Sequence, residues 1–188
     1  MSKSLEEMTL EELWRLFPIT LTEHKECWKR WYQEERSFLE MILPEGCVKR
    51  LSHVGSTSVE GIWAKPIVDI LLETNQWDWN EIRTILTANG YLCMAEKKDR
   101  LIFNKGYTPD GFAEKVFHLH VRQEGDHDEL YFRDYLREHP DTAKEYQMLK
   151  LELKEQYMYN RDGYTESKTD FVKRYTEEAK KLYSGRYE

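Results

Sequence analysis

The sequence predicts an α+β domain in which a small mixed β-sheet has helices packed on one face and is followed by a helical C-terminal part. Three observations point to this class. Apolar residues have helical spacing in the first third, form short runs between turn residues in the middle third, and return to helical spacing in the last third. No repeat, low-complexity tract or linker interrupts this order. We therefore expect a single main domain over residues 19–188, preceded by a helical extension over residues 1–18.

The first third predicts two helices. Thr9 and Glu12 have the spacing of a capping box, which would begin a short helix that ends at Pro18. A longer helix is expected over residues 23–43, because a proline and a glycine follow it closely. The residues of its apolar stripe, expected to pack inward, are Trp28, Trp31, Phe38, Met41 and Ile42.

The middle third predicts the sheet. Strands are expected at residues 48–54, 67–73, 91–95, 101–103 and 116–121. A helix is expected at residues 80–89, with Gly90 as its C-terminal stop. The segment KGYTPDGFAEK, residues 105–115, has the composition of a hairpin connection. In the last third, helices are expected at residues 126–138, 141–157 and 164–182.

Composition limits the classes of function. The net charge of -7 argues against general binding to a nucleic-acid backbone, which needs clustered Lys and Arg. The three cysteines, Cys27, Cys47 and Cys93, have no CxxC spacing, so reduced thiols are expected. The acidic N-terminus lacks the pattern of a signal peptide, and no apolar run is long enough to span a membrane. These features are typical of a soluble cytoplasmic protein.

Gly55 and Ser56 stand where a predicted strand gives way to a turn. Glycine lets a ligand approach the backbone closely, and the hydroxyls of Ser56, Thr57 and Ser58 can donate to a phosphate. The alternative is a turn in which these hydroxyls only cap the backbone.

Asp69 interrupts the apolar strand PIVDILL. A carboxylate in such a strand needs an ion-pair partner, hydrogen bonds or a metal. Strand alternation places Asp69, Leu71 and Glu73 on one face of the sheet. The alternative is a strand-end carboxylate that faces solvent or forms a salt bridge.

His118 and His120, in VFHLHV, are two residues apart on a predicted strand and share a face. Their rings can converge on one ligand or metal, or they can be hydrogen-bonded histidines at the edge of the core. His53 lies on the strand before Gly55. We expect Asp69 and at least one of the two strand histidines to line one pocket, with Ser56 at its rim and His53 within reach.

These motifs together resemble the signature of the GrpB family of bacterial proteins. The positions that carry the resemblance in HVGSTSVEGIWAKPIVDILLE are His53, Gly55, Ser56, Thr57, Gly61, Ala64, Lys65, Pro66 and Asp69. It continues through FHLHV, FRDYLREHP and YTESKTDFV, and so spans roughly residues 19 to 180.

The resemblance implies a fold of the nucleotidyltransferase superfamily, in which a Gly-Ser turn holds nucleotide phosphates and carboxylates bind divalent metal. Gly55, Ser56 and Asp69 fit this pattern, and Asp69 would be the catalytic carboxylate. Leu71, however, stands where the second carboxylate should be. Either His118 and His120 complete a different site with Asp69 for Mg, Mn or Zn, or the fold binds a nucleotide without transferring it.

Two functions follow from this resemblance. The first is a nucleotidyltransferase-like protein that binds a nucleoside triphosphate or a related phosphate compound and transfers a nucleotidyl group with a divalent metal. Gly55, Ser56 and Thr57 would hold the phosphates, and Lys65, Arg133 and Lys168 would neutralise their charge. The second is a non-catalytic nucleotide or small-molecule binding module that kept the fold but lost the carboxylate triad.

Overall fold

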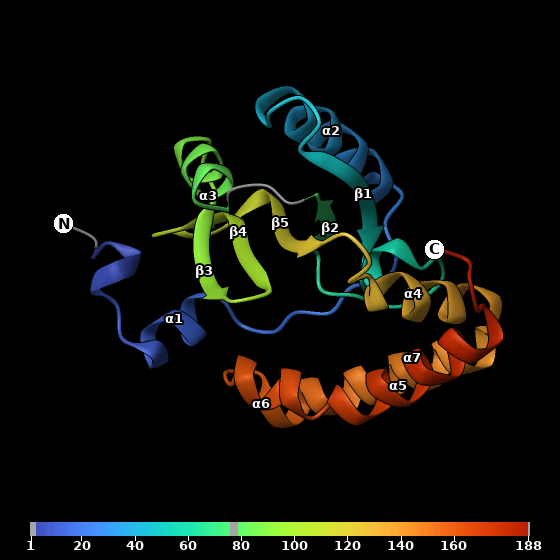
Figure 1. The fold of residues 1–188 in the computed structure, drawn as a ribbon. Helices are drawn as coiled ribbons and strands as arrows, with labels where there is room; N and C mark the ends of the chain where they lie inside the picture. Colours follow the sequence, from blue (N-terminus) through green and yellow to red (C-terminus); the bar gives the residue numbers. More distant parts are fainter. Residues whose placement is uncertain (1–2, 76–78, 188) are drawn as a thin grey trace.

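The computed structural model describes residues 3–75 and 79–187. At its centre is a five-stranded sheet with the strand order β1-β2-β5-β4-β3 (Figure 1). The strands are β1 (Val48–Val54), β2 (Val68–Thr74), β3 (Leu92–Lys97), β4 (Arg100–Thr108) and β5 (Gly111–Gln123). β2 and β5 run parallel, and the other neighbouring strands run antiparallel. The sheet is therefore mixed, as the sequence predicts.

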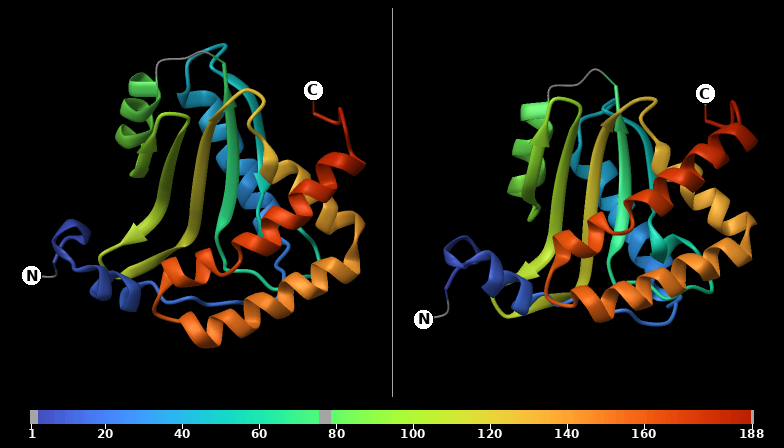
Figure 2. Two further views of the ribbon diagram at one scale, coloured as in Figure 1. Left: turned by 60° about the horizontal axis from the view of Figure 1, so that its bottom comes forward. Right: turned by 90° about the horizontal axis from the view of Figure 1, so that it is seen from below.

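Helices lie on both sides of this sheet. Those of the described residues are η1 (Leu5–Glu7), α1 (Leu10–Leu16), α2 (Cys27–Ile42), η2 (Ser56–Ser58), α3 (Trp79–Ala88), α4 (Asp128–Glu138), α5 (Pro140–Tyr157), α6 (Arg161–Glu166) and α7 (Thr169–Leu182). α2 and α3 pack on one face, and the C-terminal helices form a layer over the other (Figures 1 and 2). The α+β class is thus confirmed. Within the described parts of the chain, we find no helix with the length and apolar character that crossing a membrane requires.

The two faces of the sheet differ in chemistry because successive side chains of a strand point to opposite sides. Val68, Ile70 and Leu72 of β2 are buried in the main core. The core residues that α2 and α3 contribute include Trp28, Leu39, Ile82 and Leu86. The opposite face of β2 carries Asp69 and Leu71, and Leu71 packs against α4. The polar side chains therefore face the C-terminal helical layer.

The helix boundaries agree with the sequence in part. The capping box of Thr9 and Glu12 begins α1, and Gly90 ends α3 with a φ of 87°. α2 begins at Cys27 rather than at residue 23, because Thr22 exchanges two backbone hydrogen bonds with Ala64 and stays extended. Met41 was wrongly assigned to the buried stripe of this helix, since it is 74% exposed.

Two other segments differ from the prediction. Residues 105–115 are mostly strand, because β4 and β5 extend to Thr108 and Gly111 and leave only a two-residue turn. The single helix predicted at residues 164–182 is divided into α6 and α7. Asn160 caps the start of α6 by accepting a hydrogen bond from the Gly163 amide, and the helix ends at Glu166. Lys168, which lies between the two helices, is directed towards the polar face of the sheet.

Candidate anion-binding site

The turn after β1 brings the backbone against the carboxylate of β2. Gly55 has a φ of 70°, and a Cβ atom placed on it would lie 2.3 Å from Asp69 Oδ2. Only glycine fits this position, both because of its left-handed backbone and because of the close approach. The conformation puts Ser56 beside Asp69, although the two residues are thirteen positions apart in the chain.

Asp69 is held by the two strand histidines. Its Oδ1 atom lies 3.4 Å from His118 Nδ1 and 3.4 Å from His120 Nε2. The parallel register of β2 and β5 explains this arrangement, because it pairs Asp69 with His118 and Leu71 with His120. Burial alone would raise the pKa of Asp69, but the hydrogen bonds and charge interactions with the two histidines lower that pKa well below its usual range. Asp69 is therefore a carboxylate at neutral pH.

A chain of hydrogen bonds orients His118. Arg161 Nη2 donates to the Tyr107 hydroxyl at 2.8 Å, and that hydroxyl lies 2.8 Å from His118 Nε2. Because the hydroxyl already accepts from Arg161, it has its own proton to donate to Nε2. The remaining proton of the ring then sits on Nδ1, facing Asp69. Burial lowers the pKa of His118, which favours this neutral form.

Lysine side chains surround the same pocket. The ammonium groups of Lys65 and Lys168 lie 5.3 and 4.3 Å from the centre of the Tyr164 ring. Neither makes an ion pair or hydrogen bond within residues 3–75 and 79–187. Burial, together with the charges of Lys168 and Arg161, lowers the pKa of Lys65 to about 7. Burial lowers that of Lys168 to about 8, against the opposing effect of Asp69.

Lys150 is the most buried of these cations, with 2% of its surface exposed. Its Nζ atom donates to Ser56 Oγ at 3.0 Å and also contacts the Trp63 carbonyl oxygen. Burial and the charge of Lys168 lower the pKa of Lys150 to about 7. Lys150 thus has only neutral oxygens as hydrogen-bond partners.

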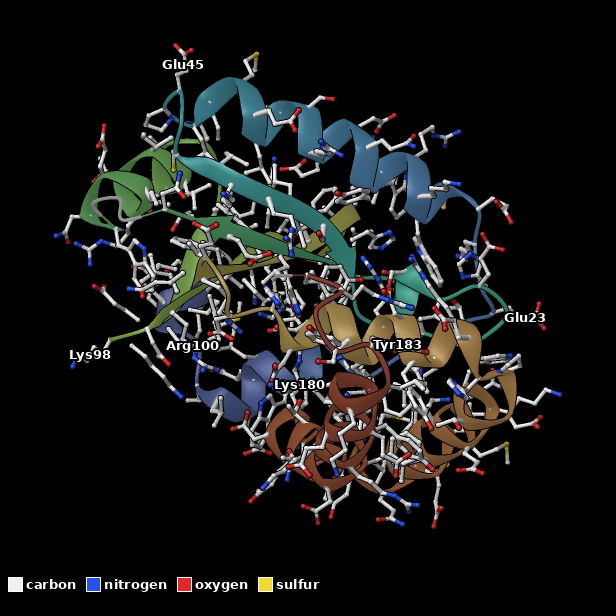
Figure 3. The ribbon with its side chains drawn as sticks, turned by 45° about the vertical axis from the view of Figure 1, so that its right-hand side comes forward. Glu23, Glu45, Lys98, Arg100, Lys180 and Tyr183 are labelled. Atoms are coloured by element: carbon white, nitrogen blue, oxygen red, sulfur yellow. The ribbon has the colours of Figure 1, made fainter. Side chains whose placement is uncertain are left out.

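The pocket between these groups has a volume of about 270 Å³. Its charged lining consists of Lys65, Asp69, Lys150, Arg161 and Lys168. Four cationic side chains therefore meet one carboxylate in a protein whose net charge is -7. A larger hollow of about 690 Å³ adjoins it and shares Gly55, Ser56 and Lys168 with it. Its lining includes Arg100 and Lys180, which Figure 3 labels, and also four carboxylates, Asp126, Asp128, Glu129 and Glu177.

Most of the predicted residues meet in this pocket. Gly55, Ser56, Thr57, Lys65, Asp69, His118, His120 and Lys168 all line it. The Thr57 side chain is buried, and its hydroxyl lies 2.9 Å from His53 Nε2. Geometry therefore supports a site here, while the roles of these residues stay predictions.

Two of the predicted residues lie elsewhere. His53 was expected within reach of Asp69, but the antiparallel register pairs it with Ile70, so its ring projects to the opposite face and stacks on Tyr32. Burial lowers the pKa of His53 to about 4. Arg133 was expected to neutralise phosphate, but its guanidinium bonds the His53 carbonyl oxygen, Asp134 and the Tyr187 hydroxyl. Both residues lie outside this pocket, because the strand register turns His53 to the other face and the C-terminus supplies Tyr187 as a partner for Arg133.

Sequence reasoning missed Lys150, Arg161 and Tyr107. A signal for Lys150 was present, since it falls on the buried stripe of α5 that Ala143, Tyr146 and Leu153 also form. A lysine is almost never fully buried unless a partner group compensates its charge, so a lysine on an apolar helix stripe indicates such a partner. Arg161 and Tyr107 gave no comparable signal.

The divalent metal implied by the resemblance does not fit this geometry. Within the described part of the chain, no three His, Cys, Asp or Glu side chains are placed to hold one ion. Both histidines direct a nitrogen at Asp69 itself, and His118 uses its other nitrogen for Tyr107. Leu71, fully buried, takes the place of a second carboxylate.

Comparison with known proteins agrees with the motifs. The family model for GrpB protein matches residues 18–178. The chain belongs to the GrpB family. The GrpB chain described here is 35% identical over 161 residues to the glutamate-rich protein GrpB of Alkalihalophilus pseudofirmus, covering 82% of this chain and 91% of that protein.

Two further GrpB relatives are informative. YqkA of Bacillus subtilis is 31% identical over 185 residues, covering 94% of this chain, but the chain spans only about half (52%) of that protein. The crystal structure of GrpB from Enterococcus faecalis superposes with a TM-score of 0.75 at 31% identity, covering 87% of this chain and 99% of that one. The Enterococcus protein therefore has the same fold.

Proposed function

We propose that this GrpB protein binds a small phosphate compound, of the nucleoside phosphate class, by direct contact with the cations of the pocket. The observation that carries the proposal is that Lys65 and Lys168 point unpaired ammonium groups into a pocket that already contains Lys150 and Arg161. Partly buried ammonium groups that outnumber the carboxylates around them are unfavourable. A phosphate would supply the missing negative charge.

The neutral donors of the pocket support the same class of ligand. Ser56 and Thr165 line it and carry hydroxyl groups that can donate to phosphate oxygens. The adjoining hollow between the sheet and α7 has room for the remainder of a nucleotide. Because Leu71 replaces the second carboxylate, transfer through a carboxylate triad is not part of the proposal.

The test compares ATP binding by calorimetry with magnesium and with EDTA. We expect binding under both conditions, and we expect Lys65→Met and Lys168→Met each to weaken it at least about tenfold, the effect of losing one charge-assisted contact of 1.5–3 kcal/mol. Lys181→Met is the matched control, since Lys181 is an exposed lysine of α7 and lies outside the pocket.

Asp69→Asn separates direct binding from metal-mediated binding. Without a bridging metal, the substitution removes a negative charge beside the anion and should preserve or strengthen ATP binding. If a metal bound to Asp69 bridges the protein and the nucleotide, Asp69→Asn and EDTA should each abolish ATP binding. Absence of binding for the whole panel of nucleoside phosphates at millimolar concentration would reject the proposal.

A further inference from the structure

Ser56 and Lys150 form a close pair that anion binding does not require. Lys150 Nζ is 3.0 Å from Ser56 Oγ, and its other contacts are the Trp63 carbonyl oxygen and the face of the Tyr146 ring, 4.9 Å from its centre. Within the described residues Lys150 has no carboxylate partner. A buried amine with neutral partners only is stabilised in its uncharged form.

The contacts of Lys150 suit an uncharged amine. A neutral amine keeps two N–H donors and gains one lone pair. One N–H can donate to the Trp63 carbonyl oxygen, and the lone pair can accept the proton of the Ser56 hydroxyl. Ser56 itself lines the pocket in which Lys65, Lys168 and Arg161 gather. Its hydroxyl therefore has a base on one side and the anion pocket on the other.

We propose that Ser56 is a nucleophile, with Lys150 as its general base, and that the pair acts on a phosphate monoester held in the pocket. This inference rests on the proposed phosphate binding and adds a covalent step to it. A serine hydroxyl is a weak nucleophile until a base within hydrogen-bond reach accepts its proton. Pairs of serine and lysine are an established solution to this requirement on unrelated folds.

The reaction balances without a further reactant except water. Lys150 accepts the Ser56 proton while Oγ forms a bond to phosphorus, and the bond between phosphorus and the ester oxygen breaks. The leaving oxygen departs on the side opposite Oγ and takes a proton from a water molecule. The resulting hydroxide attacks the phosphoserine, giving inorganic phosphate, and the Lys150 ammonium returns its proton to Ser56 Oγ. Lys65, Lys168 and Arg161 are placed to neutralise the charge on the phosphoryl oxygens.

The experiment uses two probes on the full chain: p-nitrophenyl phosphate, followed by nitrophenol release, and a fluorophosphonate, followed by mass spectrometry of the Ser56 peptide. We expect a fluorophosphonate adduct on Ser56 and slow nitrophenol release. Ser56→Ala should abolish both. Lys150→Arg keeps hydrogen-bond donors but supplies no base, so both rates should fall about 100-fold or more. Ser167→Ala, an exposed serine beside Lys168, should change neither rate.

Separate measurements distinguish this inference from the proposed function. Calorimetry with ATP shows whether the pocket binds phosphate, and the melting temperature shows whether each variant is folded. ATP binding by the wild type with neither a Ser56 adduct nor nitrophenol release would overturn the Ser56–Lys150 pair and leave the binding proposal standing. A Ser56 adduct that Lys150→Arg leaves unchanged would also overturn it. Rapid labelling of Ser56 without ATP binding would support the pair and reject the proposed ligand.

Discussion

The two carboxylates of β2, Asp69 and Glu73, lie on the same face of the sheet but in contrasting surroundings. Glu73 is 1% exposed, and it has hydrogen-bond partners at Oε1 and a cation beside Oε2. It accepts a hydrogen bond from the Gly125 amide at 3.1 Å, lies 2.8 Å from His127 Nδ1, and forms an ion pair with Arg50 at 3.1 Å. These contacts join β2 to β1 and to the chain that leads into α4.

At the Asp69 end of the strand, the charges are not balanced in this way. Asp69 contacts two histidines, while Lys65 and Lys168 stand nearby with no ion pair to any described residue. A balanced buried network holds elements of the fold together, whereas an excess of one sign of charge leaves an interaction for a ligand to complete. Glu73 therefore holds elements of the fold together, whereas the Asp69 pocket is the proposed binding site.

The largest effect that this comparison predicts is on stability. Glu73→Gln should lower the free energy of unfolding by about 3 kcal/mol, because it leaves Arg50 without its buried counter-charge. That corresponds to a fall of roughly 10 °C in melting temperature for a chain of this size. Asp69→Asn should change the free energy of unfolding by less than about 1 kcal/mol, since the amide oxygen can still accept from the histidines.

Urea denaturation of both variants measures the difference. Lys49→Gln is the control for the Glu73 end, because Lys49 forms an ion pair with Glu124 that is about half exposed and should contribute little. If Asp69→Asn proved as destabilising as Glu73→Gln, the pocket would be a structural network like the one at Glu73.

Much of the contrast could be predicted from the sequence. Asp69 was recognised because it interrupts an apolar strand, and the alternation of β2 placed it on the face of Glu73. The pairing of Asp69 with His118 and His120 could only be anticipated as one arrangement among several, because register depends on which strands are neighbours. His53 shows the consequence, since one residue of register decides which face a side chain takes.

The cations were harder to predict than the carboxylates. Lys65 and Lys168 are candidates because they lie in the family motifs, but their neighbours in the sequence do not distinguish them from surface lysines. Lys168 reaches the pocket because the chain breaks between α6 and α7, and Arg161 because α6 lies beside β4. Both depend on packing between segments about 50 or more residues apart, which the local pattern of the sequence does not encode.

The next effect is the pH dependence of anion binding. Burial and neighbouring cations lower the pKa of Lys65 to about 7, and burial lowers the pKa of Lys168 to about 8. A bound anion favours the charged lysines and raises these pKa values, so binding takes up protons. Affinity should therefore be highest below pH 7 and should fall roughly tenfold between pH 7 and pH 9.

Sulfate is the suitable probe, because its charge stays constant over this range. Calorimetry at pH 6.5, 7.5 and 8.5 in buffers of different ionisation enthalpy measures both affinity and proton uptake. Lys168→Met should weaken sulfate binding and lower the number of protons taken up, while the control Lys181→Met should retain the wild-type profile. An affinity for sulfate that does not change with pH would show that the lysines are already charged without a ligand.

The smallest effect concerns the hydroxyl that orients His118. Tyr107→Phe removes the hydrogen bonds to Arg161 Nη2 and His118 Nε2, both 2.8 Å long, and should cost about 1 kcal/mol of stability. Asp69 keeps its contact with His120, so sulfate affinity should change less than about threefold.

The tautomer of His118, measured from the ¹⁵N chemical shifts of its ring, tests the role of the Tyr107 hydroxyl more directly. In the wild type the hydroxyl donates to Nε2, so the proton should reside on Nδ1 and face Asp69, whereas Tyr107→Phe should give a mixture of tautomers. A wild-type ring protonated on Nε2 would contradict this, because the tyrosine would then accept from both neighbours and Asp69 would face a bare nitrogen.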